Sequence, residues 1–358
     1  MNLIIPMAGK SSRFPNMRPK WMLTHPSGNF MVIEAIKSLD LDFYKHIYLV
    51  VLREHEEIFK FKKGLCEELE EIGILNKSNF IFLNRATKDQ PETVKQAIEI
   101  GKIKGPIFIK DSDNHFSCEG KKGNFVCFHD LNNSGLIQPS NKSYISIDRN
   151  GFITNIVEKE VISSSYCVGG YSFSSSNDFI SYLEGLSKKQ NRYISDVIFS
   201  MILDGKKFLT KKVENYLDWG TVEDWNRFKR SYATLFLDID GTLVINSSSH
   251  FPPYIGNTKP LKSNIEIINF LYMSGKFQII LTTSRKEKFR KLTEKQLKKE
   301  GIPYDKLIMD LFHAKRIIVN DYGPSNPFKS CDAINLKRNS EELKDILKEA
   351  LGIDYQEI

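Results

Sequence analysis

Several features that would point to a membrane or secreted protein are missing from this sequence of 358 residues. No apolar run approaches the length of a membrane span, and Met1-Asn2 leads straight into an apolar segment without the basic start or cleavage site of a signal peptide. The five cysteines form no CxxC pair, which is typical of reduced, structural thiols. We therefore expect a soluble, cytoplasmic protein with no membrane partner.

Positive charge is not concentrated in any part of the chain. The formal net charge is +7, but the basic residues are scattered among acidic ones. No basic-aromatic array and no zinc-finger spacing is present, so nucleic acid is not an expected partner. The excess charge indicates a solvated surface, with anionic phosphate substrates as the alternative.

Short β-branched runs alternate with amphipathic ones in the first part of the chain. This alternation predicts an α/β fold with a largely parallel sheet. From Asn124 to Phe173 the pattern becomes β-rich, which predicts a mixed extension of that sheet. The expected elements are the strands Leu3–Pro6, His46–Leu52, Phe80–Leu83 and Pro106–Ile109 and the helices Val32–Leu39 and Glu92–Ile100.

A second alternation follows a helical segment that covers Trp219–Tyr232. The chain is long for one domain, so we predict two Rossmann-like domains, residues 1–230 and residues 231–358. A homo-oligomer is compatible with this organisation. The expected elements of the second domain are the strands Thr234–Leu237, Phe277–Leu281 and Ile317–Val319 and the helices Ile265–Ser274 and Lys286–Glu300.

The segment LFLDIDGTLV places two carboxylates, Asp238 and Asp240, at the end of an apolar run and before a Gly-Thr turn. Residues two apart in a strand project to the same side, so both carboxylates are expected at one site. Further along the chain, Thr283 stands in a Thr-Thr-Ser-Arg segment after a predicted strand, Lys315 offers a positive charge, and Asp321 offers a carboxylate that can hold Mg²⁺.

These residues resemble the haloacid dehalogenase-like phosphatases over about residues 232 to 340. The resemblance implies that Asp238 attacks phosphorus and forms an aspartyl-phosphate, while Asp240 protonates the leaving group and then activates water. It also implies that Thr283 holds a phosphoryl oxygen, that Lys315 neutralises charge, and that Asp321 completes a Mg²⁺ site with Asp238 and Asp240.

The segment between Gly241 and the next predicted helix is too short for a large cap domain. The smaller, C-terminal domain is therefore expected to be capless. A capless phosphatase leaves the mouth of its site open, so another domain or subunit is expected to supply substrate contacts.

The N-terminal segment NLIIPMAGKSSRF runs from an apolar strand into a loop of small residues that carries Lys10 and Arg13. Such a loop can wrap a triphosphate, because backbone N–H groups bind the oxygens and the cations balance the charge. Asp113 follows an apolar strand in IFIKDSDNHF, and Asp218 precedes a Gly-Thr turn in LDWGTVEDW. Two such carboxylates are able to grip one divalent ion on an α-phosphate.

Together these residues resemble the nucleotidyltransferases that activate sugar phosphates, over about residues 1 to 230. The family opens with an apolar strand, an AG-x-G-[ST]-R-like loop and a Pro-Lys pair, and here the second loop glycine is replaced by Ser11. The roles implied by the resemblance are triphosphate binding by Gly9, Ser12, Arg13 and Lys20, metal binding by Asp113 and Asp218, acceptor binding by Glu158 and Lys159, and a substrate wall at Gly169, Gly170 and Tyr171.

The segment KDQPETVKQA stands where family members carry a Gly-x-Ala-Glu-Thr-like element near the nucleobase. Asp89 and Pro91 occupy the glycine and alanine positions, which leaves Gln90 as the expected base contact. The base itself stays open: CTP is favoured, and GTP, UTP and dTTP remain alternatives.

The two resemblances together predict a bifunctional enzyme of nucleotide-activated sugar or polyol synthesis that feeds a surface polysaccharide, such as a capsule. One domain would transfer a nucleotidyl group from an NTP to a sugar or polyol phosphate and release pyrophosphate, with Mg²⁺ as cofactor. The other would hydrolyse a phosphate monoester. Two alternatives remain: an active transferase with a structural or regulatory phosphatase-like domain, and a nucleotide-sensing protein without turnover.

Overall fold

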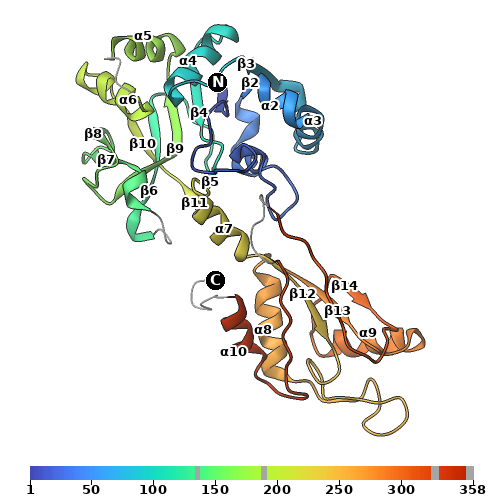
Figure 1. Cartoon of the computed structure of the whole chain (residues 1–358). Coiled ribbons are helices and arrows are strands. Elements are labelled where there is room, and N and C mark those ends of the chain that lie inside the picture. The colour runs from blue at the N-terminus through green and yellow to red at the C-terminus, as the bar shows by residue number, and fades with distance from the viewer. Residues whose placement is uncertain (134–137, 187–191, 324–329, 352–358) are drawn as a thin grey trace. The chain divides into compact units, whose positions relative to one another are not determined.

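The computed structural model describes residues 1–133, 138–186, 192–323 and 330–351 (Figure 1). The chain divides into two compact units, Met1–Trp225 (unit 1) and Asn226–Ile358 (unit 2). The division falls inside helix α7 (Val222–Arg230), whereas the sequence pattern puts the boundary directly after residue 230. Each unit is described separately below.

Unit 1 is built on a mixed sheet that has nine strands in the described part of the chain. Seven of them follow the order β10-β6-β9-β4-β1-β2-β3, and β7 pairs with both β8 and β9. Strands β1 to β4 pair in parallel, and β7, β8 and β9 form antiparallel pairs, as the change of pattern after Asn124 predicts. The strands are β1 (Asn2–Pro6), β2 (His46–Leu52), β3 (Ser78–Leu83), β4 (Ile107–Lys110), β6 (Phe125–Asp130), β7 (Ser143–Ile147), β8 (Ile153–Glu158), β9 (Ser165–Phe173) and β10 (Leu209–Lys212).

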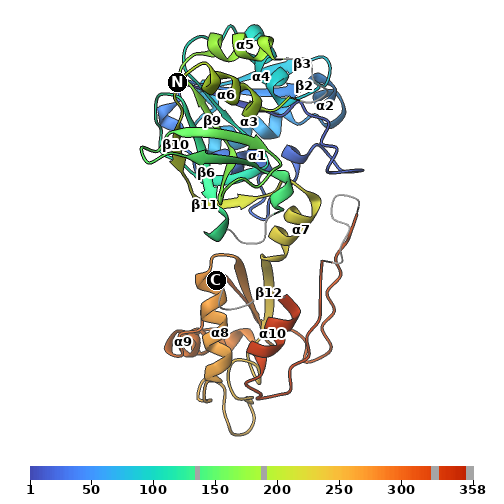
Figure 2. The same cartoon turned by 90° about the vertical axis from the view of Figure 1, so that its left-hand side faces the viewer.

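Helices cover both faces of this sheet, which explains why β1 is apolar at consecutive positions. Leu3 and Ile5 belong to one hydrophobic cluster with Leu65 of α3, and Ile4 between them belongs to another with Phe179 of α5. The helices of unit 1 are labelled in Figure 2. They are α1 (Met31–Ile36), α2 (Arg53–Phe59), α3 (Lys62–Glu71), α4 (Gln90–Ile100), α5 (Ser176–Gly185) and α6 (Ile194–Leu203).

Local capping sets where α4 begins. The side chain of Asp89 accepts a hydrogen bond from the N–H of Glu92 (2.9 Å), and Pro91 occupies the first turn, so α4 starts at Gln90. Short 3-10 turns connect other elements. They are η1 (Lys20–Met22), η2 (Leu41–Phe43), η3 (Leu75–Lys77), η4 (Leu131–Asn133), η5 (Pro139–Asn141) and, in unit 2, η6 (Glu287–Phe289).

A separate two-stranded ribbon joins distant parts of unit 1. Strand β5 (Asn114–Ser117) follows β4 almost directly and pairs antiparallel with β11 (Glu214–Asp218). Asp218 pairs with Asn114 in this register. The ribbon therefore brings the last strand of unit 1 back to the residues that follow β4.

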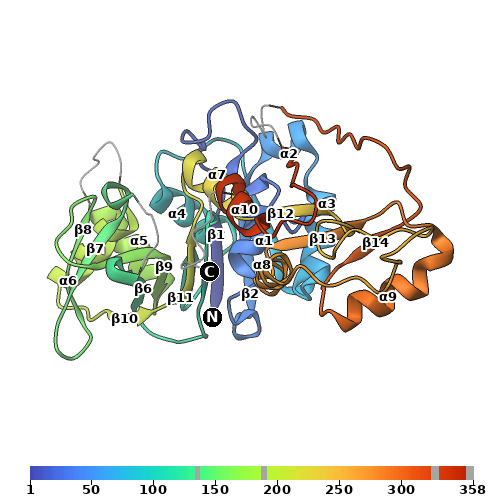
Figure 3. The same ribbon diagram turned by 90° about the horizontal axis from the view of Figure 1, so that it is seen from below.

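Unit 2 contains a parallel sheet in the order β12-β13-β14, whose strands lie next to one another in Figure 3. Its hydrophobic core joins Leu237 and Ile239 to Ile268 of α8 and Leu297 of α9, and α10 packs beside α8 (Figure 2). The elements are β12 (Ala233–Asp238), β13 (Phe277–Thr282), β14 (Lys306–Ile308), α8 (Lys262–Met273), α9 (Arg290–Lys299) and α10 (Leu343–Leu351).

The strand predicted over Ile317–Val319 is wrong. These residues have no strand pairing, and Ile317 and Val319 are 76% and 89% exposed. The position beside β13 is taken by β14, a three-residue strand absent from the sequence-based prediction. The β-branched triplet has strand propensity, but no neighbouring strand lies beside it to accept its hydrogen bonds.

The helices in the described ranges lack the length and apolar composition needed to span a bilayer.

Candidate functional site

The candidate site of unit 1 lies at one edge of its sheet. Strands β1 and β4 are parallel neighbours, so the segments that follow their carboxyl ends emerge at the same edge. The loop of residues 7–20 follows β1, and Asp113 lies in the turn after β4. Strand β9 runs antiparallel to β4 and pairs Gly170 with Lys110, so the glycines of the predicted substrate wall also lie at this edge.

The loop after β1 is shaped by Ser11, which stands where the family has its second loop glycine. Ser11 has φ of +48°, in the left-handed region that favours glycine. Its hydroxyl accepts a hydrogen bond from the N–H of Lys20 (3.2 Å), and its carbonyl accepts one from the N–H of Phe14 (2.8 Å). Gly9 and Ser12 are exposed on the same loop. The serine thus preserves the turn and ties it to the predicted phosphate-binding lysine.

The β5–β11 ribbon brings Asp113 and Asp218 together. Asp218 pairs with Asn114, the residue after Asp113. The N–H of Trp219 donates to the carbonyl of Asp113 (2.9 Å). Two carboxylates that are far apart in the sequence are therefore adjacent because of strand register.

The two carboxylates converge beside Gly220. A Cβ atom at this glycine would lie 3.1 Å from Oδ1 of Asp218, 3.4 Å from a guanidinium nitrogen of Arg13 and 3.5 Å from Oδ2 of Asp113. The three groups thus surround one small space. A side chain at position 220 would occupy it.

Each of the two carboxylates is held by a lysine. Lys20 donates to Asp113, and Arg13 lies 3.8 Å from the same oxygen. Burial opposes ionisation of Asp113, but the charges of Lys20 and Arg13 outweigh it and hold its pKa well below the usual range. Lys142 donates to Oδ2 of Asp218 at 2.5 Å. Lys142 belongs to no motif and was not predicted, because the pairing of β7 with β8 sets its position.

A further carboxylate, Asp111, lies beside Asp113 and is in contact with Gln90. It accepts a hydrogen bond from the side-chain amide of Gln90, and burial together with the charge of Asp113 raises its pKa to about 6. A Cβ atom at Gly169, where φ is +79°, would clash with Oδ2 of Asp111. Gln90 therefore lies at this sheet edge as expected, with its amide nitrogen turned toward Asp111.

A buried lysine supports the turn that carries Asp113. The ammonium group of Lys110 donates to the backbone carbonyls of Asp111 and Asn114, both at 2.8 Å, and to the side-chain carbonyl of Asn114 at 2.6 Å. It also lies 4.5 Å from the centre of the Phe116 ring. Burial lowers the pKa of Lys110 to about 8, against the attraction of the neighbouring aspartates. These hydrogen bonds fix the turn after β4.

The predicted acceptor-binding pair lies at the end of β8. Glu158 accepts hydrogen bonds from the hydroxyls of Ser143 and Ser195, the latter at 3.0 Å. Lys159, with φ of +60°, donates to the hydroxyl of Tyr193 at 2.8 Å and lies 4.9 Å from the centre of that ring. Both side chains thus have protein partners in this structure.

The donor set formed by Asp113 and Asp218 fits a divalent ion. Carboxylate oxygens are ligands that Mg²⁺ prefers, and it is commonly bound by one or two carboxylates together with water and substrate phosphates. No cluster of three or more His, Cys, Asp or Glu side chains that could hold a metal is found among the described residues. Phosphate oxygens and water would therefore complete the coordination.

A buried histidine packs against the segment that follows Asp218. The ring of His25 lies 5.6 Å from that of Trp219 and 6.3 Å from that of Trp225, measured between centroids. Glu34 lies beside His25 and forms an ion pair with Lys37. His25 is therefore buried between two indole rings on one side and polar groups on the other: the N–H of Ser27 donates to its Nδ1 at 3.0 Å, and the carboxylate of Glu34 lies within reach.

The burial of His25 predicts that unit 1 loses stability in acid. Burial lowers the pKa of His25 to about 4; Glu34 opposes the shift, and Lys37 and His115 add to it. The unfolded chain then binds a proton that the folded chain resists, so stability is lost as the pH falls from about 6.5 to about 4. The loss reaches at most about 3 kcal/mol.

The measurement is denaturant unfolding at several pH values, followed by tryptophan fluorescence. All three tryptophans, Trp21, Trp219 and Trp225, belong to unit 1, so the signal reports on that unit alone. His25→Gln should flatten the pH dependence between pH 4 and 6.5. An unchanged slope in this variant would show that another group is responsible.

The candidate site of unit 2 lies at the carboxyl end of β12. Asp238 is the last residue of this strand and pairs with Thr282 of β13. Burial raises the pKa of Asp238; the charge of Arg316, whose guanidinium lies 3.2 Å from the carboxylate, opposes this shift. The predicted cation was Lys315, but Lys315 is exposed and its neighbour Arg316 makes the contact with Asp238.

Asp240 lies beyond the strand, at the start of the turn, so strand alternation does not explain its position. Gly241, with φ of +88°, allows the chain to reverse there. Arg285 donates to both oxygens of Asp240, at 2.7 and 2.8 Å, and Ser247 adds a hydrogen bond at 2.5 Å. The Arg285 side chain is only 2% exposed. Arg285 ends the Thr-Thr-Ser-Arg segment, but the motif alone did not indicate this contact.

Of the two other predicted residues of unit 2, Thr283 lies at the expected sheet edge, whereas Asp321 lies in a segment without strand structure. Thr283 follows β13 at the same sheet edge as Asp238, but it is buried and its hydroxyl accepts the N–H of Arg285 at 3.1 Å. Asp321 is exposed, and its backbone carbonyl accepts a hydrogen bond from Ser330 (3.0 Å).

The structure does not bring the three predicted metal ligands of unit 2 together. Asp238, Asp240 and Asp321 all lie in the described ranges, within which no group of three acidic side chains forms a metal cluster. The physical reason is the absence of the strand predicted over residues 317–319. Without that strand, Asp321 is not held at the sheet edge.

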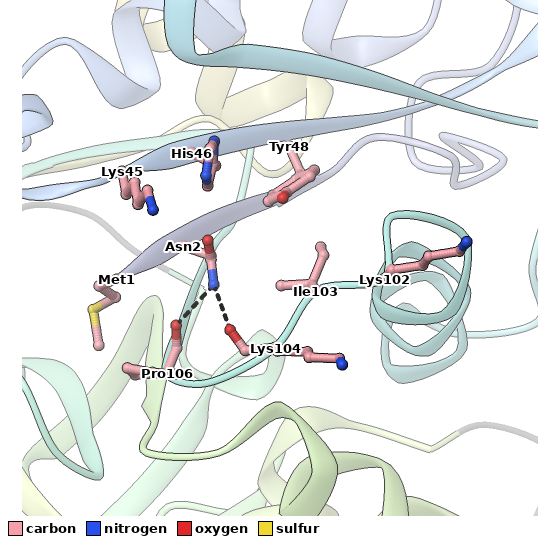
Figure 4. A pocket seen from close by; sticks show the side chains of 9 residues that line it. All are labelled: Met1, Asn2, Lys45, His46, Tyr48, Lys102, Ile103, Lys104 and Pro106. Atoms are coloured by element: carbon pink, nitrogen blue, oxygen red, sulfur yellow. Dashed lines mark hydrogen bonds between the residues drawn. The ribbon is translucent and has the colours of Figure 1, made fainter.

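A cavity of about 340 Å³ lies at the opposite edge of the unit 1 sheet (Figure 4). It is lined by Asn2, His46, Tyr48 and several lysines, among them Lys45 and Lys102. Figure 4 shows Lys45 and Lys102 on opposite sides of Asn2, so their ammonium groups do not converge. None of the predicted site residues lines this cavity.

Comparison with known proteins places the fold of unit 1. The sequence matches no protein-family model and no curated protein. Solved structures match over the N-terminal part of the chain, and they show that this part has the fold of sugar nucleotidyltransferases.

Three of these structures illustrate the likeness. A nucleoside-diphosphate-sugar pyrophosphorylase from Vibrio cholerae RC9 has a TM-score of 0.54 at 19% identity, covering 63% of this chain and 98% of its own. A UDP-glucose pyrophosphorylase complexed with UDP-glucose has a TM-score of 0.52 at 16% identity, covering 63% and 96%. An inositol-1-phosphate CTP transferase from T. maritima has a TM-score of 0.50 at 15% identity, covering 62% and 90%.

Proposed function

We propose that unit 1 is a nucleotidyltransferase that couples an NTP to a sugar or polyol phosphate and releases pyrophosphate. The observation that carries the proposal is the convergence of Asp113 and Asp218 beside Gly220, with Arg13 and Lys20 at the same place. The sugar nucleotidyltransferase fold of this part of the chain supports it. Two carboxylates facing two cations suit a substrate that brings both a metal ion and a polyphosphate.

The side chains of the site have distinct tasks in this reaction. Asp113 and Asp218 would hold Mg²⁺, which supplies further positive charge at the phosphates when it is bound. The loop after β1 binds the triphosphate and balances the charge that develops on pyrophosphate as it leaves. The residues of this loop that carry the task are Gly9, Ser12, Arg13 and Lys20.

The chemical step is a single displacement. An oxygen of the acceptor phosphate attacks the α-phosphorus, the bond to the bridging β-phosphate oxygen breaks, and pyrophosphate leaves. No covalent protein intermediate forms. The chain therefore contributes alignment and charge balance, and it needs no nucleophile of its own.

The nucleobase is proposed more narrowly from the orientation of Gln90. Its amide nitrogen donates to Asp111, which leaves its carbonyl oxygen as an acceptor for an exocyclic amine. Cytosine has such an amine and uracil and thymine lack it, which favours CTP over UTP and dTTP. Guanine also has one, so GTP is the comparison that tests the choice.

The acceptor is proposed from the comparison with known structures. One of the similar proteins is an inositol-1-phosphate CTP transferase. A polyol phosphate is therefore an acceptor to test beside the sugar phosphates.

We also propose that unit 2 hydrolyses a phosphate monoester. Asp238, at the carboxyl end of β12, is the nucleophile, and Arg316 beside it balances phosphate charge. In the first step Asp238 attacks phosphorus, and the alcohol leaves with a proton from Asp240. In the second step water attacks the phosphoryl group and gives a proton back to Asp240. This step releases phosphate and restores Asp238. Arg285 holds both oxygens of Asp240 and so fixes the orientation of this carboxyl group.

The two activities would be consecutive steps of one pathway if unit 2 acts on a bisphosphate. Its product would then be a phosphate monoester, which is the class of acceptor that unit 1 requires. The presence of both units in one chain motivates a shared pathway, and the alternative is that unit 2 acts on another phosphate ester after the transfer.

The test is a panel of NTPs against sugar and polyol phosphates with Mg²⁺, in which pyrophosphate and inorganic phosphate are measured separately. We expect one pair of NTP and acceptor to release pyrophosphate far above the others, with CTP giving the highest rate. NTP binding without release of either product would instead identify a nucleotide-sensing protein. Pyrophosphate release without phosphate release from any ester would leave unit 2 a structural or regulatory role.

A further inference from the structure

We infer that Lys142 binds the phosphate of the acceptor substrate in unit 1. This inference rests on the proposed nucleotidyl transfer and specifies which residue recognises the acceptor as a phosphate monoester. Lys142 directly precedes β7, and its carbonyl accepts the N–H of Lys159 at 2.9 Å. It therefore comes from the β7–β8 hairpin, whereas Arg13 and Lys20 come from the loop after β1.

The ammonium group of Lys142 is built into the site and is not a solvated surface charge. It donates to Asp218 at 2.5 Å and to the hydroxyl of Tyr216 at 2.7 Å, and its side chain is only 11% exposed. It also lies 5.3 Å from the centre of the Tyr216 ring and 6.0 Å from that of Tyr166. A lysine held in this way has a defined position from which to meet an anion.

The division of cations between the two carboxylates supports an acceptor role. Arg13 and Lys20 contact Asp113 and belong to the loop where the triphosphate is expected. In a displacement at phosphorus the attacking and leaving oxygens lie roughly in line, so the acceptor phosphate approaches from the side away from pyrophosphate. Lys142 is placed at the other carboxylate, Asp218, and its charge would offset the repulsion that an incoming phosphate meets there.

Lys159, the lysine that the family resemblance assigns to acceptor binding, is engaged elsewhere. Lys159 donates to the hydroxyl of Tyr193 and lies over that ring. Lys142, by contrast, contacts one of the two converging carboxylates directly. Of the two lysines, the geometry therefore favours Lys142 over Lys159 as the ligand of the acceptor phosphate.

The hydrogen bonds of Asp218 allow Lys142 to change partner. Asp218 uses Oδ1 to accept the N–H of Gly220 (3.1 Å) and Oδ2 to accept Lys142. If another cation binds Oδ2 of Asp218 and displaces the ammonium group, Lys142 loses its carboxylate partner. A phosphate oxygen is then the natural acceptor for the hydrogen bond from Lys142. The hydroxyl of Tyr216 would keep the lysine in place during the exchange.

The experiment compares Lys142→Met and Lys142→Gln with the wild type. Glutamine keeps a hydrogen-bond donor but removes the charge, so it guards against a variant that fails only because it does not fold. We expect the KM for the acceptor phosphate to rise by about 10- to 100-fold in both variants, because each loses one charge-assisted hydrogen bond to the phosphate. The KM for the NTP should stay within about threefold of the wild type, because no expected NTP contact is removed.

Lys142→Arg and Lys207→Met serve as controls. Arginine keeps the charge and should restore most of the acceptor binding. Lys207 is an exposed lysine that, like Lys142, lies over an aromatic ring, 5.2 Å from the centre of that of Phe152. Its replacement should leave both KM values unchanged, because it lies outside the site.

Two further outcomes separate the inference from the proposed function. If the wild type releases pyrophosphate and Lys142→Gln keeps the acceptor KM of the wild type, the inference is wrong while the transferase stands. If the wild type releases no pyrophosphate with any pair, the proposed function fails. Calorimetry with inorganic phosphate then still tests Lys142, since the inference requires weaker phosphate binding in Lys142→Gln than in Lys207→Met, and equal binding would overturn it.

Discussion

Replacement of Asp113 by asparagine should reduce pyrophosphate release by about 1,000-fold or more, the effect of losing a principal charged group in a preorganised site. Asp113 is the carboxylate that both Lys20 and Arg13 contact, and it faces Asp218 across the space beside Gly220. Asparagine keeps the shape but removes the charge that fixes these two cations. Phosphate release by unit 2 should be unaffected.

A matched control is available in the same unit. Asp42 also pairs with a lysine, Lys77, at 3.3 Å, but it is fully exposed and lies on η2. Asp42→Asn should retain pyrophosphate release at the wild-type rate. If Asp113→Asn and the wild type release pyrophosphate at the same rate, the proposal of metal-dependent transfer at this site is wrong.

Replacement of Asp238 by asparagine should reduce phosphate release by about 10,000-fold or more, because the variant would lack the carboxylate that is proposed to attack phosphorus. Arg285 holds Asp240 on both oxygens, so we do not expect Asp240 to replace Asp238 as the attacking group. Pyrophosphate release by unit 1 should be unchanged. The assay is phosphate release from a panel of sugar and polyol phosphate esters.

The control for this variant is Asp345→Asn, which changes an exposed carboxylate on α10. It should hydrolyse the esters at the wild-type rate. If Asp238→Asn matches it with every ester that the wild type hydrolyses, the phosphoryl-enzyme mechanism is incorrect. If the wild type hydrolyses none, unit 2 is better understood as a structural partner of the transferase.

The parts of the fold that depend on local patterns can be predicted from the sequence. The predicted bounds of β2 are the observed ones, and those of β1, β4 and α4 differ by at most two residues at either end. Apolar periodicity and helix caps are sufficient to mark these elements. Strand β14 and the segment 317–319 are mispredicted for a different reason. Whether a short apolar segment pairs depends on the neighbour available to it, which local sequence does not contain.

The same distinction applies to the candidate sites. Asp113 and Asp218 can be identified because each stands in a recognisable motif, and the β5–β11 register brings them together. Lys142 and Arg316 stand in no motif, and their positions follow from strand pairing and from the course of a loop. Arg285 lies in a motif, but its hold on Asp240 depends on a turn that strand alternation does not describe.

The charged groups of the unit 1 site have a consequence for how quickly substrates arrive. Burial, together with the charge of Asp113, raises the pKa of Asp111 to about 6, which brings part of its titration close to neutral pH. The cations of the site outnumber its carboxylates even when Asp111 is ionised, so the local balance is positive. A positive site attracts polyphosphates over about one Debye length, about 8 Å at physiological salt. Substrate capture should therefore slow as ionic strength rises, even where the bound geometry is unchanged. The groups concerned are the cations Arg13, Lys20, Lys110 and Lys142 and the carboxylates Asp111, Asp113 and Asp218.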